Sequence, residues 1–128
     1  MSKYFTEKEY LMGRDKTDPL TDEQKANMQA LLEALDKLRE AFGKPMHISS
    51  GYRPASVNKA VGGAKKSNHM LCLACDFKDP TGEIDEFCLD NIKLLEELGL
   101  YLEDINSTPG WCHLQKVAPK SGRRIFIP

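Results

Sequence analysis

The sequence contains no hydrophobic run long enough to cross a membrane. A spanning helix needs about 18 consecutive apolar residues, and polar or charged residues interrupt every apolar stretch of this chain well before that length. The first residues, from Met1 to Glu7, also lack the apolar segment of a secretory signal peptide. We therefore expect a protein that is made in the cytoplasm and does not insert into membranes.

The chain also lacks a large net charge. Its 18 Lys and Arg residues nearly balance its 19 Asp and Glu residues, which leaves a formal charge of −1 at pH 7. No overall field would attract nucleic acid or an anionic membrane, so we expect neither as a partner. With 128 residues, 41% of them apolar and 29% charged, the composition is typical of a globular protein. We expect residues 1–128 to form a single domain.

Cysteine is scarce, and its spacing indicates no disulfide framework. The chain has Cys72, Cys75, Cys88 and Cys112, and synthesis in the cytoplasm favours free thiols. Cys72 and Cys75 form a CxxC pair, but no second CxxC pair accompanies them. We therefore expect buried free thiols. A redox pair is a weaker alternative, as is a structural zinc site made of Cys72, Cys75, Cys112 and His113.

Hydrophobic periodicity predicts two main helices. The first begins after Thr21, with Gln24 in the position that completes a capping box, and ends before Gly43. The second extends from about Ile84 to Leu98 and ends before Gly99. Apolar residues recur in both at the 3.6-residue spacing of a helix that buries one face.

Shorter apolar segments predict the strands of one sheet. In chain order they are residues 46–49, 72–77, 100–105, 111–117 and 123–127. A short helix over residues 6–11 precedes them, and a polar, glycine-rich loop over residues 50–67 joins the first two strands. These elements predict an α+β fold in which a small, mainly antiparallel sheet packs against two main helices.

Three residues offer ligands for a metal ion. His69 precedes Asp76 by seven residues, and His113 lies near the C-terminus, two residues after Trp111. Two imidazoles and one carboxylate are a ligand set typical of catalytic zinc, which keeps a fourth position open. Asp76 lies among apolar residues of a predicted core strand, where a carboxylate needs a partner, a proton or a metal. The residues alone leave open whether the three side chains meet or have separate structural roles.

Several short motifs of this chain occur together in one known family. They are Ser50-Gly51-Tyr52-Arg53-Pro54, Asn58, Val61-Gly62-Gly63-Ala64, Ser67-Asn68-His69, Ala74-Cys75-Asp76 and Trp111-Cys112-His113. With these motifs the chain resembles the zinc D-alanyl-D-alanine carboxypeptidase-like family of peptidoglycan peptidases, and especially its small phage-type members. The resemblance covers most of the chain. It implies a hedgehog/D-Ala-D-Ala-peptidase-like fold and a zinc metallopeptidase that cuts peptidoglycan stem peptides, as a carboxypeptidase or an endopeptidase.

The same resemblance implies roles for individual residues. His69, Asp76 and His113 would bind one Zn²⁺, which polarises the scissile carbonyl and acidifies a water molecule. Arg53 would contact the substrate and the developing oxyanion, a task that suits its planar, permanently charged guanidinium. The remaining expected substrate contacts are Ser67, Tyr52 and Trp111.

The chain departs from the family pattern at two positions. Cys72 stands where the family usually has glycine, and we expect its side chain to pack in the core. Gly110 stands where several relatives carry an acidic general base, three residues before the last histidine. The nearest carboxylates are Glu103 and Asp104, whose side chains should point to opposite faces of a strand. We expect Glu103 to be the base, with Asp104 as the second choice.

A non-catalytic function is the alternative if neither carboxylate faces the metal. The chain would then be a virion structural or cell-wall-binding module that retains the peptidase fold. In either case we expect a peptidoglycan peptide as partner and the bacterial cell wall as the site of action, for a phage lysis or virion protein. The basic residues Lys116, Lys120, Arg123 and Arg124 could contact anionic wall polymers, but a solvated strand edge is the simpler interpretation.

Overall fold

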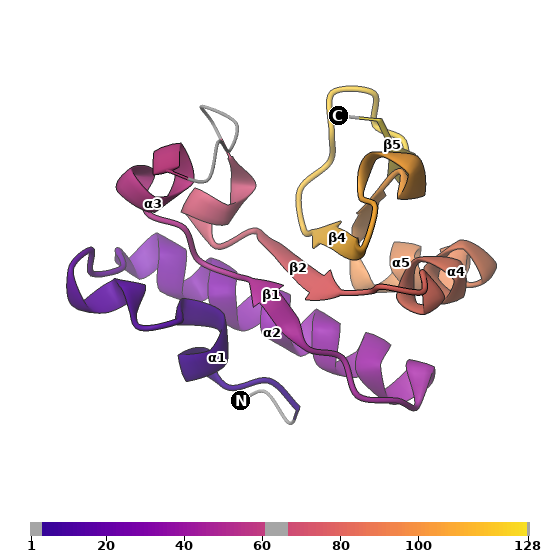
Figure 1. The fold of residues 1–128 in the computed structure, drawn as a ribbon, viewed down its shortest axis with the longest axis horizontal. Helices are drawn as coiled ribbons and strands as arrows, with labels where there is room; N and C mark the ends of the chain where they lie inside the picture. Colours follow the sequence, from indigo (N-terminus) through magenta and orange to yellow (C-terminus); the bar gives the residue numbers. More distant parts are fainter. Residues whose placement is uncertain (1–3, 61–66, 128) are drawn as a thin grey trace.

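A computed structural model describes residues 4–60 and 67–127 of the chain. The Val61–Ala64 motif therefore lies outside the described residues. Within them, a five-stranded sheet is flanked by helices (Figure 1). The helices are α1 (Glu7–Leu11), α2 (Asp22–Phe42), α3 (Ala55–Ala60), α4 (Glu83–Asp90) and α5 (Ile92–Leu98), with short 3-10 helices η1 (Arg14–Lys16), η2 (Asn68–Leu71) and η3 (Ile105–Ser107). The strands are β1 (Ile48–Ser50), β2 (Ala74–Lys78), β3 (Tyr101–Glu103), β4 (Trp111–Gln115) and β5 (Ile125–Phe126).

The sheet has the strand order β1-β2-β4-β3-β5. The first four strands pair in antiparallel fashion, and β5 joins the edge in parallel with β3. The prediction of an α+β fold with a mainly antiparallel sheet is confirmed. Strand β4 lies at the centre, so its side chains have neighbours from β2 on one side and from β3 on the other.

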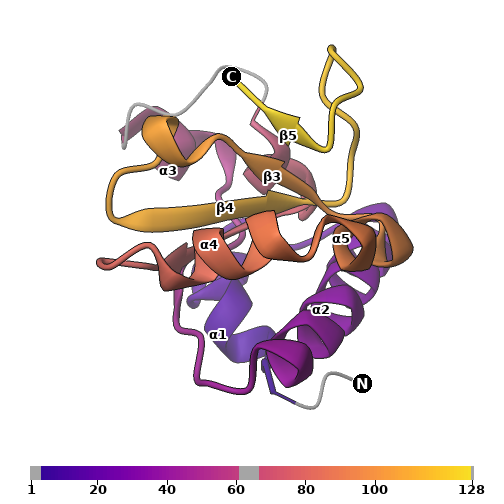
Figure 2. The ribbon, with the colours of Figure 1, turned by 90° about the vertical axis from the view of Figure 1, so that its right-hand side faces the viewer.

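Helices α1, α2, α4 and α5 lie on one face of the sheet (Figure 2). Their apolar side chains belong to one core with those of the strands. In this core, the apolar residues on one side of α2 contact alternate residues of the strands. Its members with zero exposure include Leu31, Leu35, Leu38, Cys75, Phe77, Leu95, Leu102, Cys112 and Leu114. Because side chains alternate along a strand, the residues between these core positions project from the opposite face. That second face carries Asp76 on β2 and His113 on β4.

Local signals in the sequence place the ends of α2. The Thr21 hydroxyl accepts a hydrogen bond from Gln24 N at 3.1 Å, and Gln24 Oε1 accepts one from Thr21 N at 2.8 Å. Gly43 ends the helix in the left-handed conformation with φ of 76°, which glycine adopts without steric penalty. The Gln24 amide also donates to Met70 O at 2.8 Å, so a hydrogen bond joins the start of α2 to η2.

The structure corrects three of the predicted boundaries. The single helix predicted from Ile84 to Leu98 is broken at Asn91, which has φ of −130° and donates its side-chain amide to Phe87 O at 2.8 Å. An asparagine side chain competes for backbone partners in this way. The predicted loop over residues 50–67 contains α3, which follows Pro54, a residue well suited to the start of a helix.

The third correction concerns the predicted strand over residues 72–77. Cys72 lies outside β2 and ends η2 in the left-handed conformation, with φ of 59°. A non-glycine residue rarely adopts this conformation, which gives a physical reason for the glycine that is usual here in the family that the chain resembles. None of the helices in residues 4–60 and 67–127 is long and apolar enough to cross a membrane.

Candidate metal centre

Asp76 and His113 meet across the centre of the sheet. They are direct partners in the antiparallel register of β2 and β4, and partners of this kind project side by side from the same face. His113 Nδ1 lies 2.8 Å from Asp76 Oδ1. The contact follows from strand pairing, so the backbone of two rigid strands determines its geometry.

His69 reaches the same carboxylate from η2. The Ser67 hydroxyl caps this 3-10 helix by accepting a hydrogen bond from His69 N at 3.2 Å. His69 Nε2 then lies 3.3 Å from Asp76 Oδ2, and the His69 and His113 ring centroids are 5.3 Å apart. One ligand atom from each of the three residues can be chosen so that all lie within 4.8 Å of one another. The three predicted ligands therefore converge.

The ring of His69 has a defined orientation. Its Nδ1 lies 2.9 Å from the carbonyl oxygen of Gly51, and a carbonyl can only accept a hydrogen bond. Nδ1 therefore carries the hydrogen, and in the neutral ring the lone pair of Nε2 points toward Asp76. Nε2 is buried and makes no well-directed hydrogen bond within the described residues. A buried nitrogen lone pair without a donor is suited to a metal ion.

The electrostatics of the cluster favour a carboxylate next to positive charge. Burial alone would raise the pKa of Asp76, but the contacts with His113 and His69 outweigh it and hold that pKa well below its usual range. Burial alone would lower the pKa of His113, but the hydrogen bonds to Asp76 and Gln115 outweigh it and raise that pKa. The cluster thus favours positive charge beside the Asp76 carboxylate, which either a proton or a divalent metal can supply.

The cysteines do not take part in this cluster. All four are buried free thiols, as predicted, and burial raises the pKa of Cys72 to about 12, so it remains a thiol. Cys112 neighbours His113 on β4 and belongs to the core on the other face. Among the described residues, the group arranged to hold a metal contains no cysteine. The alternative zinc site of Cys72, Cys75, Cys112 and His113 is therefore not supported.

Arg53 lies beside the metal ligands. Its backbone N–H donates to His69 O at 3.2 Å, and its Nη2 donates to Ser67 Oγ at 3.4 Å. Burial lowers the pKa of Arg53, and the nearby charge of Asp76 opposes this effect. Ser67 therefore supports both the helix that carries His69 and the guanidinium group next to it.

Glu103 and Asp104 differ in their relation to the cluster. The β3–β4 register pairs Tyr101 with Gln115 and Leu102 with Leu114, so one further step places Glu103 opposite His113 on the same face. Burial raises the pKa of Glu103, His113 opposes that effect, and the Asp76 and Asp104 carboxylates add to it. Asp104 starts η3, and its backbone N–H donates to Phe126 O at 2.7 Å. Glu103 is thus the carboxylate on the side of the metal ligands.

The two aromatic residues expected to contact substrate have different surroundings. Tyr52 is only 3% exposed, and its hydroxyl donates to Asp18 O at 3.1 Å, so its side chain belongs to the core instead of a binding surface. Trp111 is half-buried and pairs with Lys78 across β2 and β4. It lies two residues from His113 and therefore projects from the same face as the metal ligands.

Two of the basic C-terminal residues have structural partners. Lys116 Nζ donates to Leu98 O at 3.1 Å, at the end of α5, where a positive charge is favourable. Arg124 Nη1 donates to Leu100 O at 3.0 Å, and its guanidinium lies 4.1 Å from the centre of the Tyr101 ring. These contacts support the simpler interpretation of the basic cluster as part of the strand edge.

Gln115 was missed by the sequence analysis. Its Oε1 lies 2.8 Å from His113 Nε2, on the nitrogen opposite the one that faces Asp76. The available signal was its position two residues after a predicted ligand on the same strand, which places both side chains on one face. Glutamine is a common residue, so its position two residues after a histidine indicates a contact only when both are known to lie on one strand.

Comparison with known proteins identifies the family of this chain. The family model described as Peptidase M15 matches residues 3–102. No curated protein matches the chain. The matched segment includes Arg53, His69, Asp76 and Cys72 but ends before His113, which the β2–β4 pairing brings to Asp76.

Proposed function

Since the chain belongs to the peptidase M15 family of zinc-dependent metallopeptidases, we propose that it hydrolyses a peptide bond in the stem peptides of bacterial peptidoglycan. The observation that carries this proposal is the convergence of His69, Asp76 and His113. The buried Nε2 of His69, which lies beside Asp76 without a hydrogen-bond partner among the described residues, and the negatively charged Asp76 fit a divalent cation. The three residues would hold Zn²⁺ through two nitrogens and one carboxylate oxygen and leave a position for substrate or water.

The zinc ion would supply Lewis acidity, which polarises the scissile carbonyl and acidifies water. The residues of the chain would complete the reaction around it. Glu103, on the face of His113, would accept a proton from the attacking water, and its raised pKa brings it closer to the range useful for a general base. Arg53 would donate hydrogen bonds to the carbonyl oxygen as negative charge develops there.

The substrate class is supported by the motifs that the chain shares with peptidoglycan peptidases. They include Ser50–Pro54 and Ser67–His69, which contribute Arg53 and His69 to the site. Trp111 projects from the same face and would flank the bound peptide. A carboxypeptidase and an endopeptidase both fit these residues, and the protein would act at the bacterial cell wall, for example in phage-induced lysis.

A binding module is the second candidate function. Its supporting observation is Gly110, at the position where several relatives carry the acidic base; a Cβ atom there would meet no atom within 4 Å. Under this proposal the metal ligands would hold the fold or bind a wall peptide without turnover. The position of Glu103 opposite His113 favours the enzyme.

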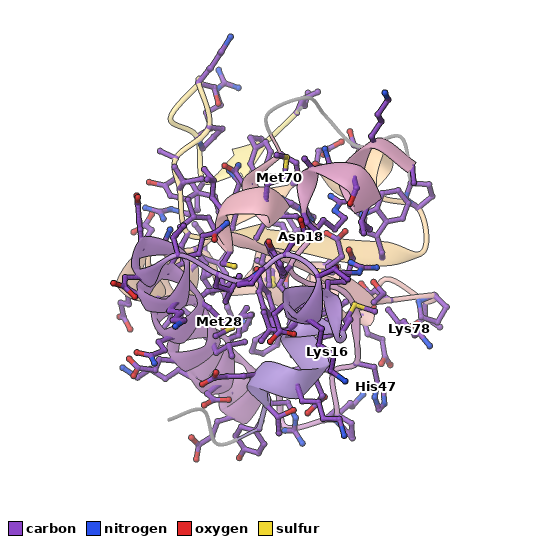
Figure 3. The ribbon with its side chains drawn as sticks, turned by 90° about the vertical axis from the view of Figure 1, so that its left-hand side faces the viewer. Lys16, Asp18, Met28, His47, Met70 and Lys78 are labelled. Carbon is purple, nitrogen blue, oxygen red and sulfur yellow. The ribbon has the colours of Figure 1, made fainter. Side chains whose placement is uncertain are left out.

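Purified peptidoglycan distinguishes the two functions. Zinc-loaded protein should release new free amino groups from it, and His69→Ala should abolish the release. His47→Ala is the matched control. His47 is exposed and lies beside Lys78, the last residue of β2 (Figure 3). No release by the wild-type protein with one bound zinc would reject the enzyme and favour the module.

A further inference from the structure

We propose that Gln115 is a positioning residue that selects the metal-binding tautomer of His113. The inference rests on the proposed zinc site and adds a residue outside the ligand set. Gln115 is 4% exposed, follows His113 by two residues on β4, and contacts the ring on the side away from Asp76. Its amide would decide which ring nitrogen carries hydrogen and which offers a lone pair to the metal.

The orientation of the Gln115 amide follows from its second contact. One end of the amide lies 2.8 Å from the carbonyl oxygen of Val117, which can only accept a hydrogen bond. That end must be the NH₂ group, so the oxygen faces His113. This assignment uses the hydrogen-bond network, which is the physical basis for distinguishing the two ends of an amide.

The amide oxygen then determines the state of the His113 ring. Gln115 Oε1 lies 2.8 Å from His113 Nε2 and can only accept, so Nε2 carries the hydrogen. A neutral ring in this tautomer has its lone pair on Nδ1, which lies 2.8 Å from Asp76 Oδ1. Two acceptors at this distance repel each other unless a cation lies between them, and a zinc ion held by His113 and Asp76 would remove that repulsion.

The two histidines differ in what holds their tautomers. His69 Nδ1 faces the backbone carbonyl of Gly51, a partner that survives any side-chain substitution. His113 depends on the side chain of Gln115. Without it, the ring can place its hydrogen on Nδ1 and donate to Asp76, which satisfies both ligands without metal. Loss of Gln115 should therefore weaken zinc binding, by about 10- to 100-fold as for other residues that orient a ligating histidine.

The test measures zinc affinity and the His113 tautomer in the full chain. The dissociation constant is obtained by competition with a chromogenic chelator for the wild type, Gln115→Met, Gln115→Glu and the control Gln29→Met, which changes an exposed residue of α2. The ¹⁵N shifts of His113 report the tautomer when they are recorded without zinc and at a pH where the ring is neutral, because a bound zinc ion or a second proton would hide the difference between the variants. We expect Gln115→Met to bind zinc about 10- to 100-fold more weakly and to lose the pure Nε2–H tautomer, whereas Gln29→Met matches the wild type.

Gln115→Glu keeps an acceptor for Nε2–H and should bind zinc more tightly than Gln115→Met. If Gln115→Met folds poorly, Gln115→Glu alone still tests the proposal, because it must show the Nε2–H tautomer. Equal zinc affinity of wild type and Gln115→Met, or a Glu variant without the Nε2–H tautomer, overturns the proposal. Failure of the wild type to bind zinc would instead reject the metal centre and the proposed function with it.

Discussion

His113 Nδ1 lies 2.8 Å from Asp76 Oδ1, although the two residues are 37 positions apart in the chain. The antiparallel pairing of β2 with β4 makes them direct register partners. A shift of that register by one residue would turn His113 to the core face and replace it with Cys112 or Leu114. The integrity of the proposed metal site therefore depends on the same strand pairing that forms the centre of the sheet.

Substitution of Glu103 separates metal binding from catalysis. Glu103→Gln should keep one zinc per chain and lower kcat/KM by about 10²- to 10⁴-fold, the usual contribution of a general base. Asp104→Asn is the matched control and should change kcat/KM only slightly, because Asp104 lies outside β3, at the residue before η3. The measurement is hydrolysis of a defined stem peptide by zinc-loaded protein. A large loss in Asp104→Asn with normal Glu103→Gln activity would reverse the assignment.

Replacement of Cys72 tests whether any thiol binds the metal. Burial raises the pKa of Cys72 to about 12, and a thiol must lose its proton to bind zinc. Cys72→Ala should therefore retain one zinc per chain with unchanged affinity. Zinc content by mass spectrometry under native conditions provides the measurement, with His69→Ala as the variant that should lose the ion. Zinc lost from Cys72→Ala and retained by His69→Ala would favour a cysteine site.

Gly51 is required for the contact of α1 with the site. A Cβ atom at this position would clash with the carbonyl oxygen of Tyr10, which accepts a hydrogen bond from Tyr52 N at 3.0 Å. Gly51→Ala should lower the free energy of unfolding by about 3 kcal/mol or more, because backbone would have to move.

Gly43→Ala is the matched control for Gly51→Ala. A Cβ atom there meets nothing within 4 Å, and only the left-handed backbone with φ of 76° opposes it. Its cost should be about 1 to 2 kcal/mol. Urea denaturation of the apo-proteins gives both values, and an equal cost for the two variants would contradict the steric explanation.

The sequence predicted the elements whose signals are local. The capping box of Thr21 and Gln24, the apolar stripe of α2 and the glycine at its end lie within a few turns of one another, so α2 was identified with both of its boundaries. His69 and Asp76 were likewise close enough in the chain to be considered together.

Features that depend on distant contacts were not predictable in this way. An asparagine such as Asn91 is compatible with a helix, and only its hydrogen bond to Phe87 O shows that the helix breaks there. Gln115 became significant only after the strand direction placed it behind His113. Tyr52 was expected at the substrate, but it is buried, and its hydroxyl donates to Asp18 O and its backbone N–H to Tyr10 O, in a distant part of the chain.

Asp85 should make stability depend on pH. It is 1% exposed, and burial, with a contribution from the Asp79 charge, raises its pKa from 3.8 to about 6. The folded state then holds the proton more strongly than the unfolded state. The contribution of Asp85 to the free energy of unfolding is fully present below pH 3.8. It is lost as the pH rises toward about 6 and remains absent at higher pH.

Asp85→Asn mimics the neutral carboxyl and removes this dependence. The variant should be more stable than the wild type at pH 7 by on the order of 2 kcal/mol, given about 1.4 kcal/mol for each pKa unit. The two proteins should have similar stability near pH 3.5, measured by urea denaturation at both pH values. A stability difference that does not change with pH would contradict the raised pKa.

The most direct measurement is a crystal structure of the zinc-loaded protein with anomalous diffraction at the zinc edge. The account predicts a single strong peak about 2.0 to 2.2 Å from His69 Nε2, an Asp76 carboxylate oxygen and His113 Nδ1. A peak at the cysteines, or zinc bound at the surface with His69 and His113 facing away from it, would contradict the account.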